Sequence, residues 1–422
     1  MTNSGLEKRR NSLRYFTPPT LWEIAVVALI FYAFFVQYAI RPLSYAMALL
    51  SAVCIMFSVL YLIACGIQRY QSFYYIILLF VFVSLGFGLI LGVSASMSLY
   101  VGLRMLEYSM TGLSVYMFSI MHRERFTHIL FFTWLSILLL AASVLLKGTM
   151  VSYGAIGLAE LNSNELSSFL LLAVFCAFLL YGETGSVLQR GCIWLSLALF
   201  LTLQVETASR RGFVVMVFML VLQFVFVLLP YNDAKRSRKR MIFYLFLVMV
   251  GAIALVALYD YIMTETVLGE RLSGNMIGGD QARMQYQTFA MEQFRKDPAF
   301  GIGIGGVAFL NGVYSHSLYL EGLACTGLIG SVPLFLALAA PIRRLIKKLL
   351  PSRRDRLSGE ETYFYKTTLL YLSAIVISGV AVVMIYDFYF YLSLGLIAAE
   401  IKITENKRRE MLQMPWEEAQ SA

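Results

Sequence analysis

Residues 72–94 read SFYYIILLFVFVSLGFGLILGVS, an unbroken run without a charged side chain. A helix needs about 20 predominantly apolar residues to cross the hydrocarbon core of a membrane, so this run alone is long enough to span one. The whole chain has the same character, because 59% of its 422 residues are hydrophobic and 14% are charged. Soluble proteins carry about 25% charged residues. The composition therefore excludes a soluble enzyme and predicts an all-α, polytopic helical bundle in a membrane.

Further apolar runs bring the prediction to about twelve transmembrane helices in a single membrane domain, residues 1–422. The runs fall near residues 21–40, 43–66, 72–94, 100–121, 127–146, 166–182, 192–206, 213–230, 241–259, 317–340, 366–385 and 387–401. The longest predicted loop, residues 261–315, lies between the ninth and tenth helices, and a basic loop covers residues 341–365. Long loops on one face of a bundle are more often functional than idle.

The positions of the 34 Lys and Arg residues predict the orientation of the chain. Cytoplasmic loops carry an excess of these residues, and most of them fall inside if the N-terminus is cytoplasmic. Both termini and the 341–365 loop are then cytoplasmic, and the 261–315 loop is external. The net charge of +9 follows from this distribution and from attraction to anionic membrane lipids, so nucleic acid is not an expected partner.

Two adjacent arginines stand where the seventh predicted helix ends and the eighth begins, in VETASRRGF at 205–213. A charge at mid-membrane depth costs about 2.5–3.5 kcal/mol on insertion scales, so Arg210 and Arg211 need an explanation. They either mark an exposed turn and reach lipid headgroups, or they form an anion site, since guanidinium matches phosphate oxygens. Arg271 and Arg283 of the external loop are candidates for the same site, although each has an acidic neighbour with which it can pair.

The end of the external loop reads KDPAFGIGIGGVAFLNGVYSHSLYLEGL at 296–323. Residues 301–306 match G-x-G-x-x-G, but they neither follow a strand nor open a helix, so no dinucleotide cofactor is predicted. We interpret the glycines as tight turns where the loop re-enters the bundle. His316 stands just before the tenth helix and can face a cavity at the membrane surface, although a boundary histidine is often structural. Glu321 lies about 140° further around the helix, so the two are not expected on one face.

These motifs together resemble those of the O-antigen ligase and O-antigen polymerase superfamily, multi-span enzymes that transfer lipid-linked glycans. SRRG at 209–212 looks like its Ser-Arg-Gly signature, and DPAFGIGIGG at 297–306 looks like its Pro-x-x-Gly-x-Gly segment. HSLYLEGLACTGLIG at 316–330 is similar to its His-Asn-x-x-Leu and Gly-Leu-x-Gly helix, and LNSNELSSFLL at 161–171 to the Asn at the start of an earlier span.

The sequence departs from the family pattern at two points. Ser317 follows the histidine where the family often has Asn, which leaves any role of that Asn unfilled. The doubled arginine leaves open whether Arg210 or Arg211 is the family position.

The resemblance implies an inverting, metal-independent glycosyl transfer from an undecaprenyl-pyrophosphate-linked glycan donor, at the periplasmic face of the bacterial inner membrane. It implies that arginines hold the pyrophosphate leaving group and that the histidine deprotonates the attacking hydroxyl. We therefore expect Arg210, Arg211, Arg283 and Arg271 at the pyrophosphate, His316 as the base and Glu321 in an orienting role. No external acidic cluster of the kind that holds a metal ion is found in the sequence, and neither a metal nor a cofactor is expected.

Polymerase and ligase use the same donor and differ in the acceptor, which is another lipid-linked repeat unit or lipid A core. We favour the polymerase, because a chain with sparse family residues better suits the more divergent group, and a chain-length regulator protein is then a further candidate partner. A flippase is the alternative of another class, and it would place ionisable residues near the bilayer midplane. Within the predicted helices these are chiefly Glu321 and the pair Arg104 and Glu107, whose i, i+3 spacing predicts an ion pair. The other candidates gather at the external edge, which favours the enzyme.

Overall fold

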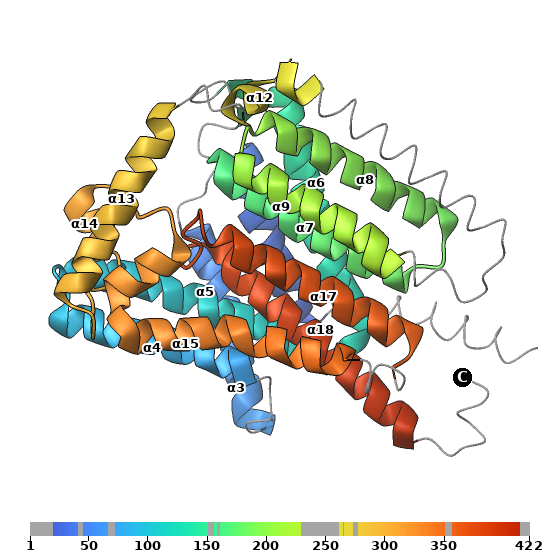
Figure 1. Ribbon diagram of the computed structural model, residues 1–422. Helices are drawn as coiled ribbons and strands as arrows, with labels where there is room; N and C mark the ends of the chain where they lie inside the picture. The colour runs from blue at the N-terminus through green and yellow to red at the C-terminus, as the bar shows by residue number, and fades with distance from the viewer. Residues whose placement is uncertain are drawn as a thin grey trace, which may run out of the picture.

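The computed structural model describes residues 20–40, 45–65, 72–150, 156–157, 161–228, 261–264, 266–272, 277–350 and 357–413. These residues are almost entirely helical (Figure 1). The strands found among them are β1 (Thr149–Met150) and β2 (Ile156–Gly157), which form one short antiparallel pair.

The helices follow the order of the predicted apolar runs. Their bounds are α2 (Leu21–Phe31) with its π-helical continuation η1 (Tyr32–Ile40), α3 (Ala46–Cys65), α4 (Ser72–Leu91), α5 (Ala95–Met121), η2 (Arg123–Arg125), α6 (Phe126–Lys147), α7 (Ser163–Glu183), α8 (Val187–Glu206), α9 (Arg210–Leu222) with η4 (Gln223–Leu228), α12 (Val267–Leu272), α13 (Ile277–Lys296), α14 (Gly306–Asn311), α15 (Leu318–Leu349), α17 (Gly359–Ser378) and α18 (Phe388–Gln413).

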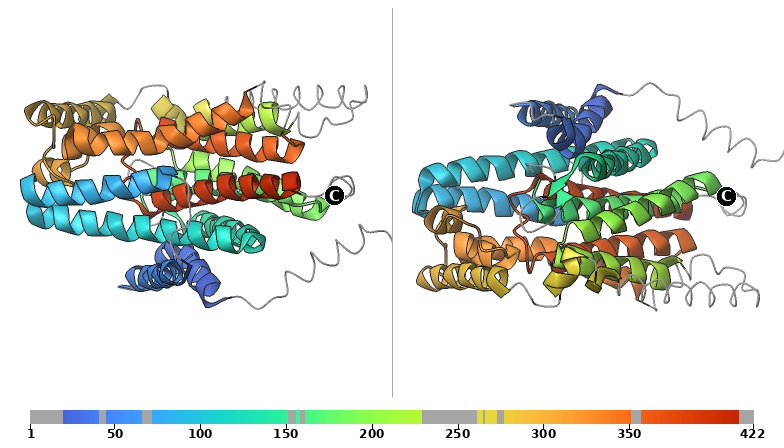
Figure 2. Two further views of the ribbon diagram at one scale, coloured as in Figure 1. Left: turned by 90° about the horizontal axis from the view of Figure 1, so that it is seen from below. Right: turned by 90° about the horizontal axis from the view of Figure 1, so that it is seen from above.

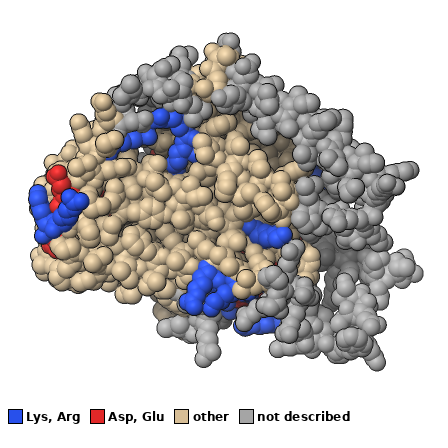
Figure 3. Space-filling view, in the orientation of Figure 1, with Lys and Arg blue, Asp and Glu red and all other residues tan. Residues whose placement is uncertain are grey.

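Eight of the described helical segments are long and apolar enough to cross a membrane. Large hydrophobic side chains remain exposed along them, for example Ile63, Ile90 and Leu195, as expected where lipid rather than water surrounds the protein. The space-filling view shows a broad uncharged surface on which Lys and Arg form small separate groups (Figure 3). The protein is therefore a multi-pass helical membrane protein, which confirms the predicted fold class.

The predicted number of twelve spans stays a prediction. Eleven of the predicted runs overlap with described helices, but α5, α17 and α18 are more polar than the eight candidate spans. The ninth predicted run, 241–259, lies outside the described residues. The cytoplasmic location of both termini is likewise untested.

The two long predicted loops contain regular structure. The 261–315 segment carries the three helices α12, α13 and α14, and in Figure 1 α13 and α14 lie at one end of the bundle. The 341–365 segment is helical at both ends, because α15 continues to Leu349 and α17 begins at Gly359.

Helix α7 lies at the centre of the packing. Every side chain from Leu166 to Tyr181 is buried, as expected for a helix that is apolar on all sides. It contacts α6, α8, α9 and α17, while α18 packs against α5 and α17 (Figure 2). The polar first turn of α7, at Asn164 and Glu165, is therefore held inside the bundle.

Candidate functional site

The SRRG motif fixes the start of α9 against the start of α7. The Ser209 hydroxyl accepts a hydrogen bond from the Gly212 N–H at 3.4 Å and donates one to Oδ1 of Asn164 at 3.0 Å. A Cβ at residue 212 would overlap the hydroxyl of Ser167 and the side-chain amide of Gln204. The serine of the motif therefore caps the helix, and its glycine permits the close contact between the two helices.

The Arg211 side chain is turned into this junction and is only partly hydrogen-bonded. Its Nη2 donates to the Asn164 carbonyl oxygen at 3.0 Å and to the Ser168 hydroxyl at 3.3 Å. Its Nε and Nη1 are buried and have no hydrogen-bond partner among the described residues. Such unsatisfied buried donors are costly, so this guanidinium would bind an anion favourably. Arg210 is half-buried and lies about 100° around the helix, so the two side chains point in different directions.

Arg283 links Arg211 to His316. It lies in α13, is half-buried, and its positive charge acts on both of the other groups. Burial and this charge both lower the pKa of His316, so the imidazole is neutral at neutral pH. The Tyr286 ring, also from α13, packs on the imidazole with 5.8 Å between ring centroids. Arg283 therefore lies within electrostatic range of both Arg211 and His316.

The backbone around His316 is held in a strained conformation. His316 has φ +57°, which is left-handed for a residue other than glycine and costs on the order of 1–3 kcal/mol. The Ser315 hydroxyl donates to the Ser317 carbonyl oxygen at 3.0 Å and accepts from the Ser317 N–H at 3.3 Å. The Leu318 N–H donates to the Gly379 carbonyl oxygen at 2.8 Å. The residues on both sides of the imidazole are thus fixed to their neighbours.

Glu321 supports this loop and forms no hydrogen bond to His316. Its carboxylate is fully buried and accepts from the Ser315 N–H at 2.9 Å, the Tyr386 O–H at 3.0 Å and the Cys325 S–H at 3.5 Å. Glu321 could orient His316 only through the Ser315 backbone, and this role stays a prediction.

The glycine-rich segment before α14 re-enters the bundle, as the sequence predicted. Gly303 has φ +90°, and a Cβ there would lie 2.6 Å from the Cα of Gly92, the residue after α4. At Gly327 the helical path of α15 is interrupted, with φ +56° and ψ −163°. The next N–H, of Leu328, donates to the Pro298 carbonyl oxygen at 2.9 Å. The break in α15 thereby provides partners for the re-entrant backbone.

The fourth predicted arginine, Arg271, belongs to α12, but its side chain lies outside the described part of the structure. Its role at the pyrophosphate stays a prediction. Within the described ranges, no group of three or more His, Cys, Asp or Glu side chains is placed to hold a metal ion.

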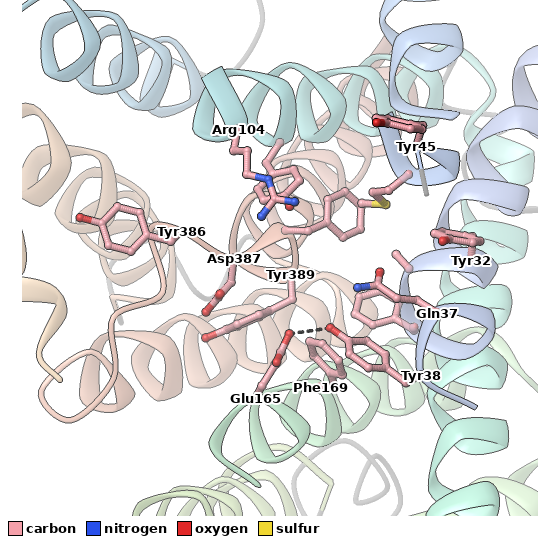
Figure 4. A pocket seen from close by; sticks show the side chains of 15 residues that line it. Tyr32, Gln37, Tyr38, Tyr45, Arg104, Glu165, Phe169, Tyr386, Asp387 and Tyr389 are labelled. Atoms are coloured by element: carbon pink, nitrogen blue, oxygen red, sulfur yellow. Dashed lines mark hydrogen bonds between the residues drawn. The ribbon is translucent and has the colours of Figure 1, made fainter. Parts of the chain in front are cut away.

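A cavity of about 450 Å³ (Figure 4) is lined in part by Asp387 and Tyr389, both of which interact electrostatically with Arg211. Its lining residues are Tyr32, Ala33, Phe34, Gln37, Tyr38, Tyr45, Met47, Arg104, Tyr108, Glu165, Phe169, Tyr386, Asp387, Phe388 and Tyr389. The Tyr38 hydroxyl donates to Oε1 of Glu165 at 2.7 Å. The charge of Asp387 interacts with those of Glu165 and Arg211.

Sequence reasoning missed both acids of this cavity. Asp387 stands at the boundary between the last two predicted apolar runs, and in the structure it ends the connection between α17 and α18. Glu165 stands in the first turn of α7, where an acidic residue is ordinary. The signal available in each case was a lone acid beside a long apolar run, at a depth where charges are rare.

The predicted ion pair between Arg104 and Glu107 is not formed in the described structure. The Arg104 guanidinium lies over the Tyr100 ring at 5.3 Å from its centroid, and Glu107 Oε1 is buried without a hydrogen-bond partner among the described residues. Arg104 instead lines the cavity, so its interaction with an aromatic face and a polar space replaces the local pair.

No protein-family model matches the chain, and no curated protein matches it. The fold is similar to a chain from a solved structure described as "Structural coordination of polymerization and crosslinking by a peptidoglycan synthase complex". The TM-score is 0.44 and the sequence identity 18%, over 81% of this chain and 99% of that chain. A similarity of this size establishes neither a family nor a function for the protein.

Proposed function

We propose that the protein is a membrane glycosyltransferase that polymerises undecaprenyl-pyrophosphate-linked oligosaccharide repeat units. The observation that carries the proposal is the buried guanidinium of Arg211, whose Nε and Nη1 have no partner among the described residues, within electrostatic reach of Arg283. Guanidinium N–H groups donate strong, charge-assisted hydrogen bonds to phosphate oxygens. The charge of Arg283 acts in turn on a neutral His316, so a cationic site and a base belong to one place.

In the proposed reaction the acceptor hydroxyl attacks the anomeric carbon of the donor sugar. The bond from that carbon to the pyrophosphate oxygen breaks, and the lipid pyrophosphate leaves with the electron pair. His316 takes the hydroxyl proton, for which a neutral imidazole with a lowered pKa is suited. Arg211 and Arg283 stabilise the negative charge that builds on the leaving group, and a single displacement inverts the anomeric centre.

The proposal includes a location. The predicted charge distribution along the chain puts the α9 start, α13 and His316 on the side opposite the basic loops. The reaction would then take place at the periplasmic face of a bacterial inner membrane, where the donor is anchored by its lipid.

Deletion followed by complementation tests the proposal. Polymerase loss should leave surface glycan one repeat unit long, and complementation with Arg211→Ala or His316→Ala should not restore the ladder. Arg295→Ala is a matched control, because Arg295 is exposed on α13, about 18 Å along the helix from Arg283. Wild-type ladders from the two site variants at matched expression would refute the site.

The same deletion separates polymerase from ligase. A ligase would leave long glycan on undecaprenyl pyrophosphate and none on lipid A core. A requirement for a chain-length regulator is a further expectation of the polymerase, and it is tested by comparing ladder lengths with and without that protein.

A lipid-linked oligosaccharide transporter is the second candidate, and the cavity favours it. Arg104, Glu165 and Asp387 place ionisable groups inside the helical bundle, as transport pathways often do. Purified protein in vesicles that contain lipid-linked repeat units distinguishes the two. Formation of new glycosidic bonds supports the enzyme, and movement of the substrate across the bilayer without new bonds supports the transporter.

A further inference from the structure

We propose that the cavity beside Arg211 is a sugar-binding subsite that holds one saccharide unit of the lipid-linked substrate while the arginines hold its pyrophosphate. We call it the tyrosine–carboxylate cavity, after Tyr38, Tyr389, Glu165 and Asp387 in its lining. The inference rests on the proposed function and adds to it the place and chemistry of glycan recognition.

The size and lining of the cavity suit a sugar. Its volume, about 450 Å³, lies within the range of about 300–1,000 Å³ typical of small-molecule sites. Tyrosine and phenylalanine rings, among them Tyr108, Phe169 and Phe388, offer apolar faces to the C–H groups of a pyranose. Carboxyl oxygens and the Gln37 amide offer the acceptors and donors that sugar hydroxyls need.

One carboxylate of the cavity is already oriented. Glu165 Oε1 accepts a hydrogen bond from the Tyr38 hydroxyl. The second carboxyl oxygen of Glu165 has no hydrogen-bond partner among the residues that the structure describes. In Figure 4 the Gln37 amide extends from the opposite helix toward the same space. Gln37 likewise makes no hydrogen bond to another described side chain. The cavity therefore holds polar groups that are positioned but not used by the fold.

The charges distinguish this cavity from the pyrophosphate site. The lining holds two carboxyl groups, of Glu165 and Asp387, and one cation, Arg104, so it offers hydrogen-bonding oxygens for hydroxyls rather than a cationic cluster for phosphate. Arg211 and Arg283, which are not in the lining, supply two positive charges that act on each other, and the charge of Asp387 also acts on Arg211. A sugar phosphate has this same division, with hydroxyls at one end and negative charge at the other.

The two sites are contiguous. Asp387 and Tyr389 line the cavity, and both interact electrostatically with Arg211. Figure 4 shows their side chains on the same side of the cavity, close to Glu165. A sugar in the cavity would therefore have a neighbouring phosphate within reach of the arginines.

A binding experiment with two probes tests the proposal on the full-length protein in lipid nanodiscs. The first probe is the repeat-unit oligosaccharide, released from the lipid carrier of a deletion strain and freed of phosphate. The second is inorganic pyrophosphate. Glu165→Ala and Gln37→Ala should each weaken oligosaccharide binding about tenfold, as expected for loss of one hydrogen bond in a buried site, and leave pyrophosphate binding unchanged. Arg211→Ala should do the reverse.

Two variants keep the test independent of folding. Gln37→Ala breaks no hydrogen bond between described side chains, so it should fold even if Glu165→Ala does not. Glu292→Ala is the matched control for Glu165→Ala, because Glu292 is exposed on α13, and it should bind both probes like wild type.

The outcomes separate the two proposals. Oligosaccharide binding that neither cavity variant weakens, or that Arg211→Ala weakens as much as it weakens pyrophosphate binding, overturns the separate sugar subsite. Pyrophosphate that fails to bind the wild type, with oligosaccharide binding intact and sensitive to the cavity variants, overturns the proposed function but leaves a sugar site. Displacement of the oligosaccharide by the lipid-linked unit identifies the donor's sugar as the occupant, and simultaneous binding identifies the acceptor's; each supports the subsite.

Discussion

Replacing Arg211 with methionine should abolish activity and leave the stability of the protein nearly unchanged. Methionine keeps the apolar stem and loses the charge. The change removes two hydrogen bonds, from Nη2 to the Asn164 carbonyl and the Ser168 hydroxyl, and bonds to charged groups contribute about 1.5–3 kcal/mol each. It also removes a buried charge with two unpartnered N–H groups, whose burial costs several kcal/mol. Because the two effects oppose each other, we expect the free energy of unfolding to change by less than about 2 kcal/mol.

The effect on catalysis has no such compensation. Loss of two charge-assisted hydrogen bonds to the leaving group removes about 3–6 kcal/mol of transition-state stabilisation, which is about 10²–10⁴ in rate. Transfer of labelled repeat units by purified protein measures the rate, and thermal unfolding in the same detergent measures stability. Arg295→Met, at an exposed position of α13, should match wild type in both assays.

An arginine with a purely structural role predicts the opposite pair of results. Arg211→Met would then lower the unfolding temperature by many degrees and keep the wild-type rate per folded molecule. That combination would refute the assignment of the Nε and Nη1 groups to a bound anion.

Three further substitutions test the surroundings of the site. Arg283→Gln should raise the pKa of His316, because a like charge is removed, so the acid limb of the activity–pH profile should move to higher pH; an unmoved limb contradicts the proposed base. Glu321→Gln turns an amide N–H₂ toward one buried donor, which should cost about 1–3 kcal/mol in chemical denaturation and lower the rate per folded molecule, whereas a wild-type rate would remove its positioning role. Gly303→Ala should destabilise the protein more than Gly312→Ala in the same denaturation assay; both residues have positive φ, but a Cβ meets a neighbour only at 303, so equal losses would contradict the close approach.

The fold class was readable from the sequence because lipid leaves the backbone few choices. Unpaired N–H and C=O groups cannot be hydrated in hydrocarbon, so long apolar runs such as 72–94 must be helices. The same reasoning does not apply at the membrane surface. Helix α13 has polar residues on most sides, and its segment was predicted only as a loop because hydropathy gives no signal for a helix that does not span.

The site was readable only in part. The sequence analysis selects Arg211, Arg283 and His316 by their place on the expected external side, and in the structure Arg283 lies within electrostatic range of the other two. The choice between Arg210 and Arg211 requires the rotation of α9 relative to α7, and no local pattern gives that angle. Predicting that Asp387 belongs to the cavity requires knowing that the α17–α18 connection lies near the start of α7. Asp387 and Glu165 of α7, which interact there, are more than 200 positions apart in the chain.

The hydrogen-bonding state of the buried polar groups separates supporting residues from candidate ligand-binding ones. Glu321 is buried and saturated by donors from three residues, so it has little capacity left for a substrate. Arg211 has two buried donors without a partner among the described residues, and Glu165 accepts from Tyr38 at one oxygen in the lining of the neighbouring cavity. A fold selected for stability alone would satisfy or remove the Arg211 donors, since each is costly when left without a partner. An unsatisfied guanidinium that interacts electrostatically with the lining of a cavity rich in tyrosine and carboxyl groups therefore argues for a ligand with a phosphate end and a hydroxyl-rich end.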